Sequence, residues 1–398
     1  MHPSDHAPGQ KVALGQSETE VVIRPFDPLT AIRADWTAFH AYRRARHEEA
    51  WPDDPILTDE QQEEDERDPD PEGDSLRWVA SANGRIVASI SAYLPKPDSP
   101  HFAERARFLH AYGSVLRPWR RRGLGRRLLA QVHDLMCAHD KTLLTVFTHE
   151  PDGHDFLRHI GAAEKMRSVE NRLRVDGLDW TMLDCWEAAT LRALPGCEFL
   201  SYGPRVPAEV LEPQLPFRAA LLDDEPRDEL EHAPIRIEMS TMNEWYRDLD
   251  RVGGAHHLIV LRDRDGAIVG LTDIAWDSRT PDRVYQMLTG VQRDKRGLGL
   301  AKGLKAAMLR TIRTQFPAVS QVVTYNAQSN AAMMAINNRL GFTVHRHYGT
   351  YQIDRQAIGD ELVRLAAPIE LFRIHVARNL HAPQSGAIRL ELRAIRHM

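Results

Sequence analysis

Two stretches of the chain combine basic residues and glycines at the same spacing. Residues 115–125 read VLRPWRRRGLG and residues 291–301 read VQRDKRGLGLA, so both fit the pattern V-x4-R-x2-G-x-[G/A]. A glycine-rich turn before a helix leaves backbone N–H groups open to an anion, and neighbouring arginines add charge-assisted bonds to phosphate. The pattern therefore predicts a pyrophosphate-binding loop that occurs twice.

Other phosphate and metal motifs fit the chain less well. A single copy would more often be an ordinary surface turn, but two copies in one register favour a binding loop. No G-x4-G-K-[ST] sequence occurs, and Lys302 stands where a dinucleotide fingerprint requires a small residue. His149 and His154 are one residue too far apart for a zinc helix, and Pro151 interrupts them. We expect no metal ion.

Each loop must be held by a helix that follows it and by strands on either side. Apolar residues recur at helical spacing after both loops, at Leu124, Leu128, Val132 and Met136 and at Leu300, Leu304, Met308 and Ile312. Asn83-Gly84 and Asp265-Gly266 predict hairpin turns upstream. Strands are expected at 110–115, 142–150, 285–291 and 320–326, and short helices within 154–162 and 330–342. The sequence therefore predicts a duplicated α+β unit.

The motif also carries a resemblance to a known family. R-x-x-G-x-[G/A] after a strand that ends in valine, with N-x10-G-F from Asn330 to Gly341-Phe342, resembles the GNAT superfamily of acyl-CoA-dependent N-acyltransferases. The likeness covers both halves and is stronger in the second. It implies a mixed, mainly antiparallel sheet with helices on both faces, in two tandem GNAT-like domains packed as a pseudo-dimer.

The resemblance implies acetyl-CoA, or another acyl-CoA, as co-substrate in a V-shaped gap between the strands that end at Val291 and near Tyr325. Its pyrophosphate would lie on the loop amides beside Arg296, and Asn330 would hold the pantetheine arm. The implied binding residues are Thr289, Val291, Arg296, Gly297, Leu298, Gly299, Leu300, Ala301, Asn326 and Asn330. A weaker site is expected at Val115, Arg120, Arg121, Arg122, Gly123, Leu124 and Gly125.

Acyl transfer to an amine needs a neutral amine, a polarised carbonyl and a stabilised leaving thiolate. The resemblance implies the backbone N–H near Val291 as the group that polarises the carbonyl. It also implies a tyrosine four residues before the final glycine, but Leu157 and Asn337 stand there. The base stays open among residues that the second half offers: Gln286, Asp273, His256, His257 and Tyr325.

The two copies differ in ways that bear on activity. The segment between the loop and the final glycine is shorter in the first copy by about one helical turn. In the register of the motif, Glu150 corresponds to Asn326, and the first copy offers nothing like Asn330. A carboxylate beside a coenzyme A arm would not help binding, so we expect the second domain to be active and the first to be degenerate.

Composition places the chain among folded globular proteins. It has 398 residues, 42% of them hydrophobic, and a formal net charge of −5, which disfavours a protein that coats nucleic acid. Three cysteines without CxxC spacing argue against a disulfide framework and a thiolate zinc site. The sequence shows no signal peptide or membrane-spanning run, so a cytoplasmic location is expected.

The remaining segments complete a predicted domain plan. We expect a flexible tail at 1–20, an N-terminal domain at 21–185, an ordered connector at 186–230, a C-terminal domain at 231–360 and an extension of strands or helix at 361–398. Residues 59–74 contain ten acidic residues and one basic one. They fit a solvated linker better than an acidic mouth that would attract a polyamine.

These observations favour an enzyme that transfers acetyl, or another short acyl group, from coenzyme A to the amine of a small molecule by direct attack on the thioester. The missing tyrosine and base keep a second reading open, a catalytically inactive coenzyme A-binding sensor or scaffold. We expect neither nucleic acid nor membrane as a partner, and a monomeric pseudo-dimer or a homodimer.

Overall fold

The computed structural model describes residues 20–99 and 101–364. The predicted tail at 1–20 and the predicted extension at 361–398 lie almost wholly outside these residues. Within the described residues, no helix is long and apolar enough to cross a membrane.

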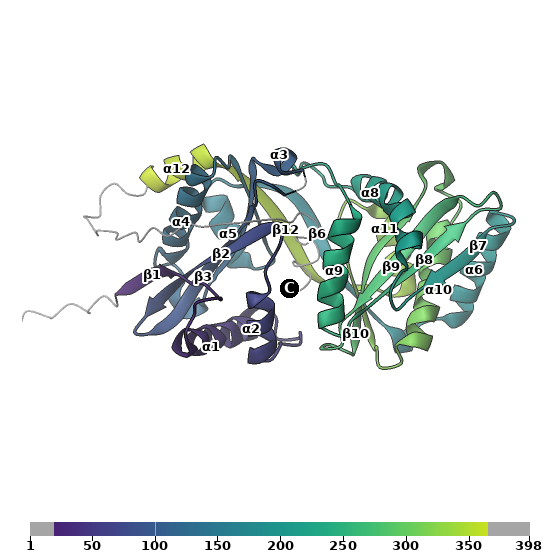
Figure 1. The fold of residues 1–398 in the computed structure, drawn as a ribbon, viewed down its shortest axis with the longest axis horizontal. Coiled ribbons are helices and arrows are strands. Elements are labelled where there is room, and N and C mark those ends of the chain that lie inside the picture. Colours follow the sequence, from purple (N-terminus) through teal and green to yellow (C-terminus); the bar gives the residue numbers. More distant parts are fainter. Residues whose placement is uncertain (1–19, 100, 365–398) are drawn as a thin grey trace, which may run out of the picture.

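The strands of the described residues form one mixed sheet of twelve, in the order β1-β2-β3-β4-β5-β12-β6-β11-β10-β9-β8-β7 (Figure 1). Neighbouring strands are antiparallel except for the parallel pairs β4–β5 and β10–β11. The strands are β1 (Val21–Pro25), β2 (Gly73–Ala82), β3 (Arg85–Pro95), β4 (Phe108–Val115), β5 (Leu143–Thr148), β6 (Ala163–Arg174), β7 (Glu198–Tyr202), β8 (Ala255–Arg262), β9 (Ile268–Trp276), β10 (Arg283–Val291), β11 (Gln321–Ala327) and β12 (Thr343–Asp354).

The middle of this sheet is an exchange of strands between the two halves of the sequence. β12, the last strand of the chain, pairs with β5, while β6 pairs with β11. β6 and β12 also pair with each other, which joins the halves into one sheet. We call β1–β5 with β12 the N-terminal unit and β7–β11 with β6 the C-terminal unit. The domain boundaries 21–185 and 231–360 remain a prediction. The sheet itself is continuous across both units.

Helices cover both faces of the sheet, as predicted. They are α1 (Arg33–Ala50), α2 (Asp59–Arg67), α3 (Phe102–Arg105), α4 (Leu124–Ala138), α5 (Pro151–His159), α6 (Trp180–Ala193), α7 (Ala208–Leu211), α8 (Leu215–Asp223), α9 (Met239–Arg251), α10 (Leu300–Gln315), α11 (Ala331–Leu340) and α12 (Arg355–Arg364). The exchange extends to helices, because α12 packs on α4 and α6 packs on α10. Figure 1 shows the units side by side, with β6 and β12 at their junction.

The predicted helices after the two loops are α4 and α10, and their apolar stripes are buried. Leu128 and Met136 lie in the cores of the N-terminal unit, and Leu304 and Met308 lie in a core of the C-terminal unit. A separate core joins α8 and α9 to β8, β9 and β10. The connector is therefore part of the packed structure, and its strand β7 forms one edge of the sheet.

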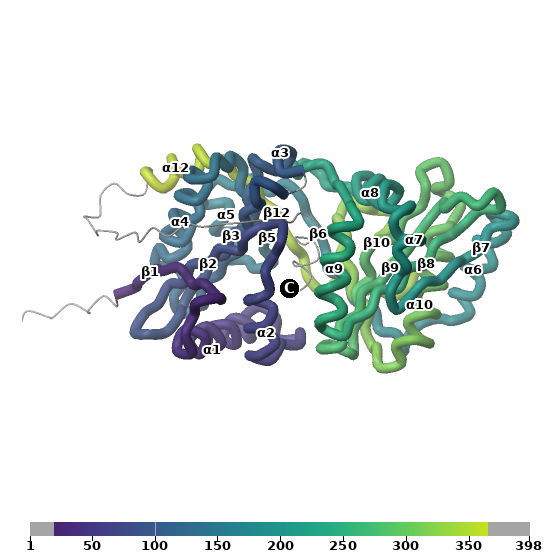
Figure 2. Tube along the Cα trace, in the orientation of Figure 1, coloured from purple at the N-terminus to yellow at the C-terminus, as the bar shows by residue number. Residues whose placement is uncertain are grey.

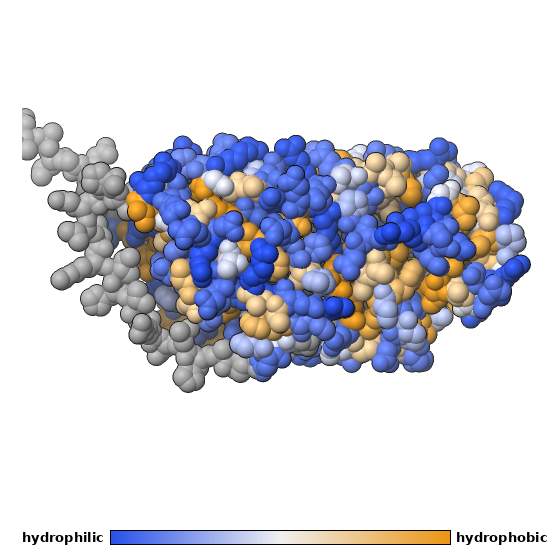
Figure 3. Space-filling model, turned by 90° about the horizontal axis from the view of Figure 1, so that it is seen from above, coloured by the Kyte–Doolittle hydropathy of each residue, from blue (hydrophilic) through white to orange (hydrophobic). Residues whose placement is uncertain are grey.

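The two predicted hairpins also form. Asn83 and Gly84 connect β2 to β3 with positive φ angles of 50° and 75°, and Gly266 connects β8 to β9 with a φ of 89°. Such turns require residues that tolerate positive φ. Seen from above, the described surface is mainly hydrophilic, and hydrophobic residues are interspersed more over the C-terminal unit (Figure 3).

Candidate functional site

The two glycine loops have the same backbone conformation. Arg120 has φ −67° and ψ 159°, and Arg296 has φ −67° and ψ 158°. Gly123 has φ 75° and Gly299 has φ 79°, and each stands directly before its helix with no side chain that caps it. The first N–H groups of α4 and α10 are therefore available to an anion.

The arginine of each motif holds its loop. Arg120 Nε donates to the Val115 carbonyl at 2.9 Å, and Arg296 Nε donates to the Val291 carbonyl at 3.3 Å. The guanidinium of Arg296 also reaches Asp224 at 2.7 Å. Arg296 was expected beside a pyrophosphate, but in this structure its guanidinium links the loop to the end of α8.

The charge around the loops distinguishes the two copies. The first copy has Arg121, Arg122, Arg126 and Arg127 in the loop and first helical turn, where the second has Gly297, Leu298, Lys302 and Gly303. None of the four arginines forms an ion pair within the part of the chain that the structure describes. A polyanion would therefore meet more unpaired positive charge at the first loop.

Both parallel strand pairs diverge, as the resemblance implied for the second copy. β4 and β5 pair from Phe108 and Leu143 as far as Ala111 and Val146, and the rest of β4 leaves β5. β10 and β11 pair only as far as Tyr285 and Val323. In the N-terminal unit the diverging part of β4 is exposed or half-buried throughout.

The gap in the C-terminal unit is crossed by side chains of the chain itself. Thr324 Oγ1 donates to the Gln286 carbonyl at 3.0 Å, directly beyond the last strand pair. The Lys305 amine donates to Gln286 Oε1 at 2.8 Å, and the Gln286 amide reaches Thr272 at 3.1 Å. Lys305 is 1% exposed, and burial lowers its pKa to about 7. Gln286 is therefore a structural link between the strands.

A second network occupies the bulge of β10. The register of β10 with β9 shifts between Gln286 and Thr289, and the Leu288 N–H that this frees donates to Asp273 Oδ1 at 2.9 Å. Asp273 also accepts from Arg218 and contacts His256 at 3.2 Å. Burial opposes ionisation of Asp273, but these two neighbours outweigh it and hold its pKa below the usual value.

Those two candidate bases therefore lie in a closed chain of contacts. The His256 ring contacts the Tyr246 hydroxyl on its other side at 2.7 Å, and both Asp273 and His256 are fully buried. His257 is buried as well and packs edge-on against Phe316. None of these candidates lines the cavity described below.

Helix α8 covers the outer part of β10 (Figure 2). A Cβ at Gly290 would lie 2.8 Å from a methyl group of Leu221 on α8. Thr289 is buried and bonds Thr272 at 2.7 Å. The end of β10 that was expected to bind a pantetheine arm is thus covered on one face by α8, and its Thr289 side chain already bonds β9.

The predicted asparagines of the second copy are also engaged. Asn330 caps α11 by accepting from the Met333 N–H at 3.2 Å. Asn337 is fully buried, and its amide donates to Asn326 Oδ1 at 2.7 Å. Tyr325 alone of the catalytic candidates lines the cavity, and burial raises its pKa well above the usual value.

The structure corrects the correspondence assigned to Glu150. Glu150 stands directly before α5 and Asn330 stands directly before α11, so these two residues are equivalent. Asn326 instead corresponds to a residue within β5. The pairing of Glu150 with Asn326 was wrong because the chain between loop and strand is longer in the second copy, which moves the register.

Glu150 is neutralised by two arginines. It accepts from Arg46 at 2.6 Å and from Arg120 at 3.1 Å, and Arg120 also reaches Asp152 at 2.6 Å. The carboxylate is therefore paired, so its electrostatic repulsion of a bound coenzyme A is weaker than the sequence suggested.

A cavity of about 550 Å³ lies between the two units. Its lining comes from α1, β2–β5, β6, β12 and β9–β11, and includes His110 on the paired part of β4 and Tyr112 and Ser114 on its diverging part. Burial lowers the pKa of His110 to about 4 and raises that of Tyr112 to about 12. Sequence reasoning missed these residues because they carry no motif and meet only when the strands assemble.

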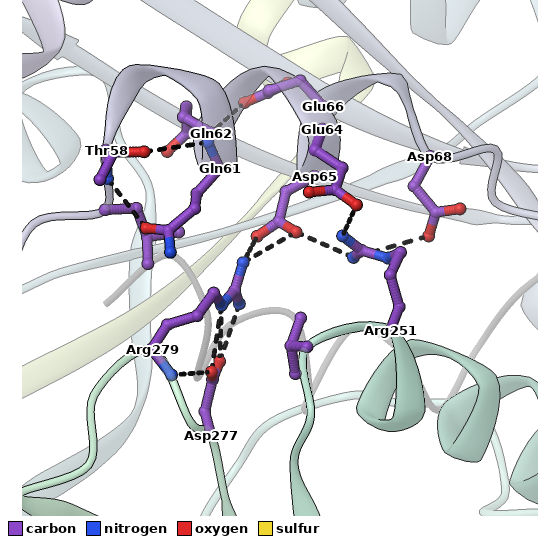
Figure 4. Close-up of polar contacts among 12 residues, drawn as sticks. Thr58, Gln61, Gln62, Glu64, Asp65, Glu66, Asp68, Arg251, Asp277 and Arg279 are labelled. Atoms are coloured by element: carbon purple, nitrogen blue, oxygen red, sulfur yellow. Dashed lines mark hydrogen bonds and ion pairs between the residues drawn. The ribbon is translucent and has the colours of Figure 1, made fainter.

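The acidic segment is a helix that joins the units (Figure 4). Asp65 on α2 contacts Arg251 at 2.8 Å and Arg279 at 3.0 Å, both in the C-terminal unit. Arg279 is also held by Asp277 at 2.7 Å. The solvated-linker interpretation was therefore wrong, because residues 59–67 form α2 and pair with arginines. No group of three or more His, Cys, Asp or Glu in the described ranges could hold a metal ion.

Comparisons with known proteins agree with this architecture. The family model of the acetyltransferase (GNAT) family matches residues 36–162, in the N-terminal unit, although the motifs were stronger in the second half. A tandem GNAT protein from the clavulanic acid biosynthesis pathway, without AcCoA, is similar over 84% of this chain and 99% of its own, with 22% identity and a TM-score of 0.61. A GCN5-related N-acetyltransferase from Sphaerobacter thermophilus covers 84% and 96%, with 17% identity and a TM-score of 0.57.

No curated protein matches the chain. Both similar structures share the two-unit arrangement over most of this chain, and the family model matches the unit that contains α4 and its loop. Residues 36–162 therefore match the acetyltransferase (GNAT) family model, and the chain has the fold of a tandem GNAT protein.

Proposed function

We propose that the protein is an N-acyltransferase that moves acetyl, or another short acyl group, from acyl-CoA to the amine of a small molecule. We further propose that the N-terminal unit holds the acyl-CoA, which departs from the expectation drawn from the sequence. One contrast carries this choice. Diverging β4 is exposed or half-buried and borders the cavity, whereas on β10 the Leu288 N–H already donates to Asp273 and Gly290 is covered by Leu221 of α8.

The loop residues fit the phosphates of coenzyme A. The backbone N–H groups of Gly123 and Leu124 lie at the start of α4, where no side chain caps the helix. Arg121 and Arg122 come directly before them in the sequence. A Cβ at Gly123 would meet no atom within 4 Å, so the space in front of the loop is open. Backbone donors with adjacent guanidinium groups are a suitable environment for a pyrophosphate.

The chemistry follows from the groups on β4. The amine nitrogen forms a bond to the thioester carbon, the carbon–sulfur bond breaks, the amine loses a proton and the thiolate leaves. His110 is unprotonated at neutral pH because burial lowers its pKa to about 4, so we propose it as the proton acceptor. Tyr112 keeps its proton because its pKa is about 12, so we propose that its hydroxyl stabilises the leaving thiolate as a hydrogen-bond donor, a role that Leu157 cannot fill.

Acetyl-CoA binding to matched glycine variants tests the assignment. Gly123 and Gly299 have φ angles of 75° and 79°, and a Cβ at either position would lie in open space, so Gly123→Glu and Gly299→Glu carry the same backbone strain. We expect acetyl-CoA to raise the melting temperature of wild type and Gly299→Glu, and not that of Gly123→Glu. The reverse pattern would place the donor in the C-terminal unit, and no difference would contradict both sites.

Thiol release then separates the two functions that the sequence left open. Wild type with acetyl-CoA and a panel of amines should release free coenzyme A, and Gly123→Glu should not. Acetyl-CoA binding without release from any amine would instead support a coenzyme A-binding sensor. The replacement of the usual tyrosine by Leu157 and Asn337 is the observation that favours that alternative.

A further inference from the structure

Five charged side chains meet where the two units join. Arg172 on β6 contacts Asp54 at 2.5 Å and Glu170 at 2.5 Å. Arg346 on β12 contacts Asp54 at 2.6 Å and Glu170 at 3.0 Å, and Arg283 on β10 contacts Asp54 at 2.9 Å. We call these five residues the seam cluster. Both units contribute to it, because β12 belongs to one and β6 and β10 to the other.

The seam cluster carries one more positive than negative charge. Its five side chains are between 1% and 10% exposed, and three guanidinium groups share two carboxylates. Burial opposes ionisation of Asp54, but the arginines outweigh it and hold its pKa below the usual value, so the carboxylate is charged. Arg283 Nε has no hydrogen-bond partner within the described residues. A buried excess charge is costly unless another group compensates it.

All five residues of the seam cluster line the cavity that also borders His110 and Tyr112. The nearby acidic helix does not supply the missing negative charge. Asp65 is engaged by Arg251 and Arg279, and Glu66 is engaged by Arg77. A negative group brought by a ligand would complete the seam cluster.

The rest of the cavity wall includes several aromatic rings. The rings come from α1, β3, β4 and β5 in one unit and from α9, β9, β10 and β11 in the other, and they include Tyr93, Phe147, Trp245, Trp276, Tyr285 and Tyr325. A volume of about 550 Å³ lies within the usual range for small-molecule pockets. Such walls favour a flat, apolar body over a flexible polyamine.

We infer that the acyl acceptor is an amine that bears one carboxylate on an aromatic or similarly flat body, and that the seam cluster binds this carboxylate. The amine in this inference rests on the proposed function. The carboxylate rests on the excess positive charge of the seam cluster. A single negative charge matches the single excess positive charge, which favours a carboxylate over a doubly charged phosphate. Acceptor selection then depends on both units, since the seam cluster exists only where they join.

A matched pair of probes tests the inference. para-(Aminomethyl)benzoate and para-(aminomethyl)benzamide share the amine and the ring and differ in the negative charge. With wild type and acetyl-CoA, we expect kcat/KM for the benzoate to exceed that for the benzamide by about tenfold or more. Binding of both probes to the protein with coenzyme A, measured by calorimetry, should show the same preference without depending on turnover.

Variants of the seam cluster connect the preference to its source. Arg283→Gln should reduce the preference for benzoate to about threefold or less, and Arg346→Gln serves as a second variant if the first does not fold. Arg174→Gln is the control, because Arg174 lies on the same strand as Arg172 but pairs with Asp176 at the surface. The control should keep the wild-type preference.

The outcomes separate this inference from the proposed function. Equal use and equal binding of the two probes by wild type, or a preference that survives Arg283→Gln and Arg346→Gln, would overturn the carboxylate assignment. The melting-temperature shift with acetyl-CoA reports the donor site in the same samples. If the protein binds the benzoate but does not bind acetyl-CoA, the carboxylate assignment to the seam cluster would stand and the acyltransferase proposal would be overturned.

Discussion

Glu150 and Asn330 occupy the same position in the two units, directly before the short helix that follows the diverging strand. Asn330 uses its side chain to cap that helix, whereas Glu150 turns its carboxylate toward Arg46 and Arg120. One repeated fold therefore uses equivalent positions in two ways. In the C-terminal unit the residue closes a helix end, and in the N-terminal unit it sets the charge beside the proposed donor site.

Replacing Glu150 by Gln tests that charge. We expect acetyl-CoA to bind about two- to tenfold more tightly, because a carboxylate near the anion is removed and Arg120 and Arg46 keep their positive charge. The folded state should lose about 2 kcal/mol, because Arg46 is buried and loses its ionic partner. Calorimetry and urea denaturation measure the two effects.

Asp152→Asn is the control for this variant. Asp152 also pairs with Arg120, but its side chain is 60% exposed, so the expected loss is below about 1 kcal/mol. Weaker acetyl-CoA binding by Glu150→Gln would contradict the placement of the donor in the N-terminal unit.

Much of the architecture follows from local signals in the sequence. Glycines with positive φ, apolar residues at helical spacing and Asn-Gly or Asp-Gly turns are set by short-range sterics, so the loops, α4, α10 and the hairpins could be predicted. The exchange of β6 and β12 could not. The backbone hydrogen bonds of a strand can pair with any strand of suitable length. Which strands β6 and β12 pair with depends on long-range packing, such as that of α6 on α10.

The candidate site shows the same division. The loop around Gly123 has a motif, whereas His110, Tyr112 and the seam cluster become a site only through assembly of distant strands. The preference for the second copy was drawn from Asn330, Asn326 and Glu150. Contacts that no motif reveals, such as that of Leu221 on α8 with Gly290, argue the other way.

Lys305→Met should stabilise the protein in a pH-dependent way. The pKa of Lys305 is about 7 in the folded state against about 10.4 for an unfolded chain. Between these values the unfolded state binds more protons, so the stability of the wild type rises with pH across this window. The advantage of the variant should be largest near pH 7, a few kcal/mol at most, and should shrink toward pH 10.

Thermal unfolding of both proteins at several pH values checks this prediction. Loss of the Lys305 bond to Gln286 costs about 1 kcal/mol at every pH, so the slope with pH is the decisive quantity. A difference between variant and wild type that is constant from pH 7 to 10 would show that Lys305 is not buried as an uncharged amine. Lys302→Met, at the start of the same helix, should leave the slope unchanged.

His110→Ala should lower kcat about a hundredfold, because the proposed proton acceptor is lost. The KM for acetyl-CoA should change little. In wild type, kcat/KM should rise between pH 6 and 9 as the amine acceptor loses its proton, with no loss due to His110 until the pH approaches its pKa of about 4. Steady-state rates across pH measure both effects.

His47→Ala is the matched control for His110. His47 also lines the cavity, but it lies on α1 and its ring contacts the Asp54 carbonyl at 2.9 Å. Its loss should change kcat by less than about threefold. Equal losses in the two variants would mean that His110 shapes the cavity and does not accept the proton.

Asp65→Ala should weaken the attachment of α2 to the C-terminal unit. Asp65 is 8% exposed on its side chain and faces two guanidinium groups, so we expect a loss of about 3 kcal/mol in the free energy of unfolding. Because Arg279 lines the cavity, the KM for the acceptor should rise as well. Glu64→Ala is the control, since Glu64 is 61% exposed and lies 3.6 Å from Arg251. Its effect on urea denaturation should stay below about 1 kcal/mol, and equal effects would show that α2 is held by its other contacts.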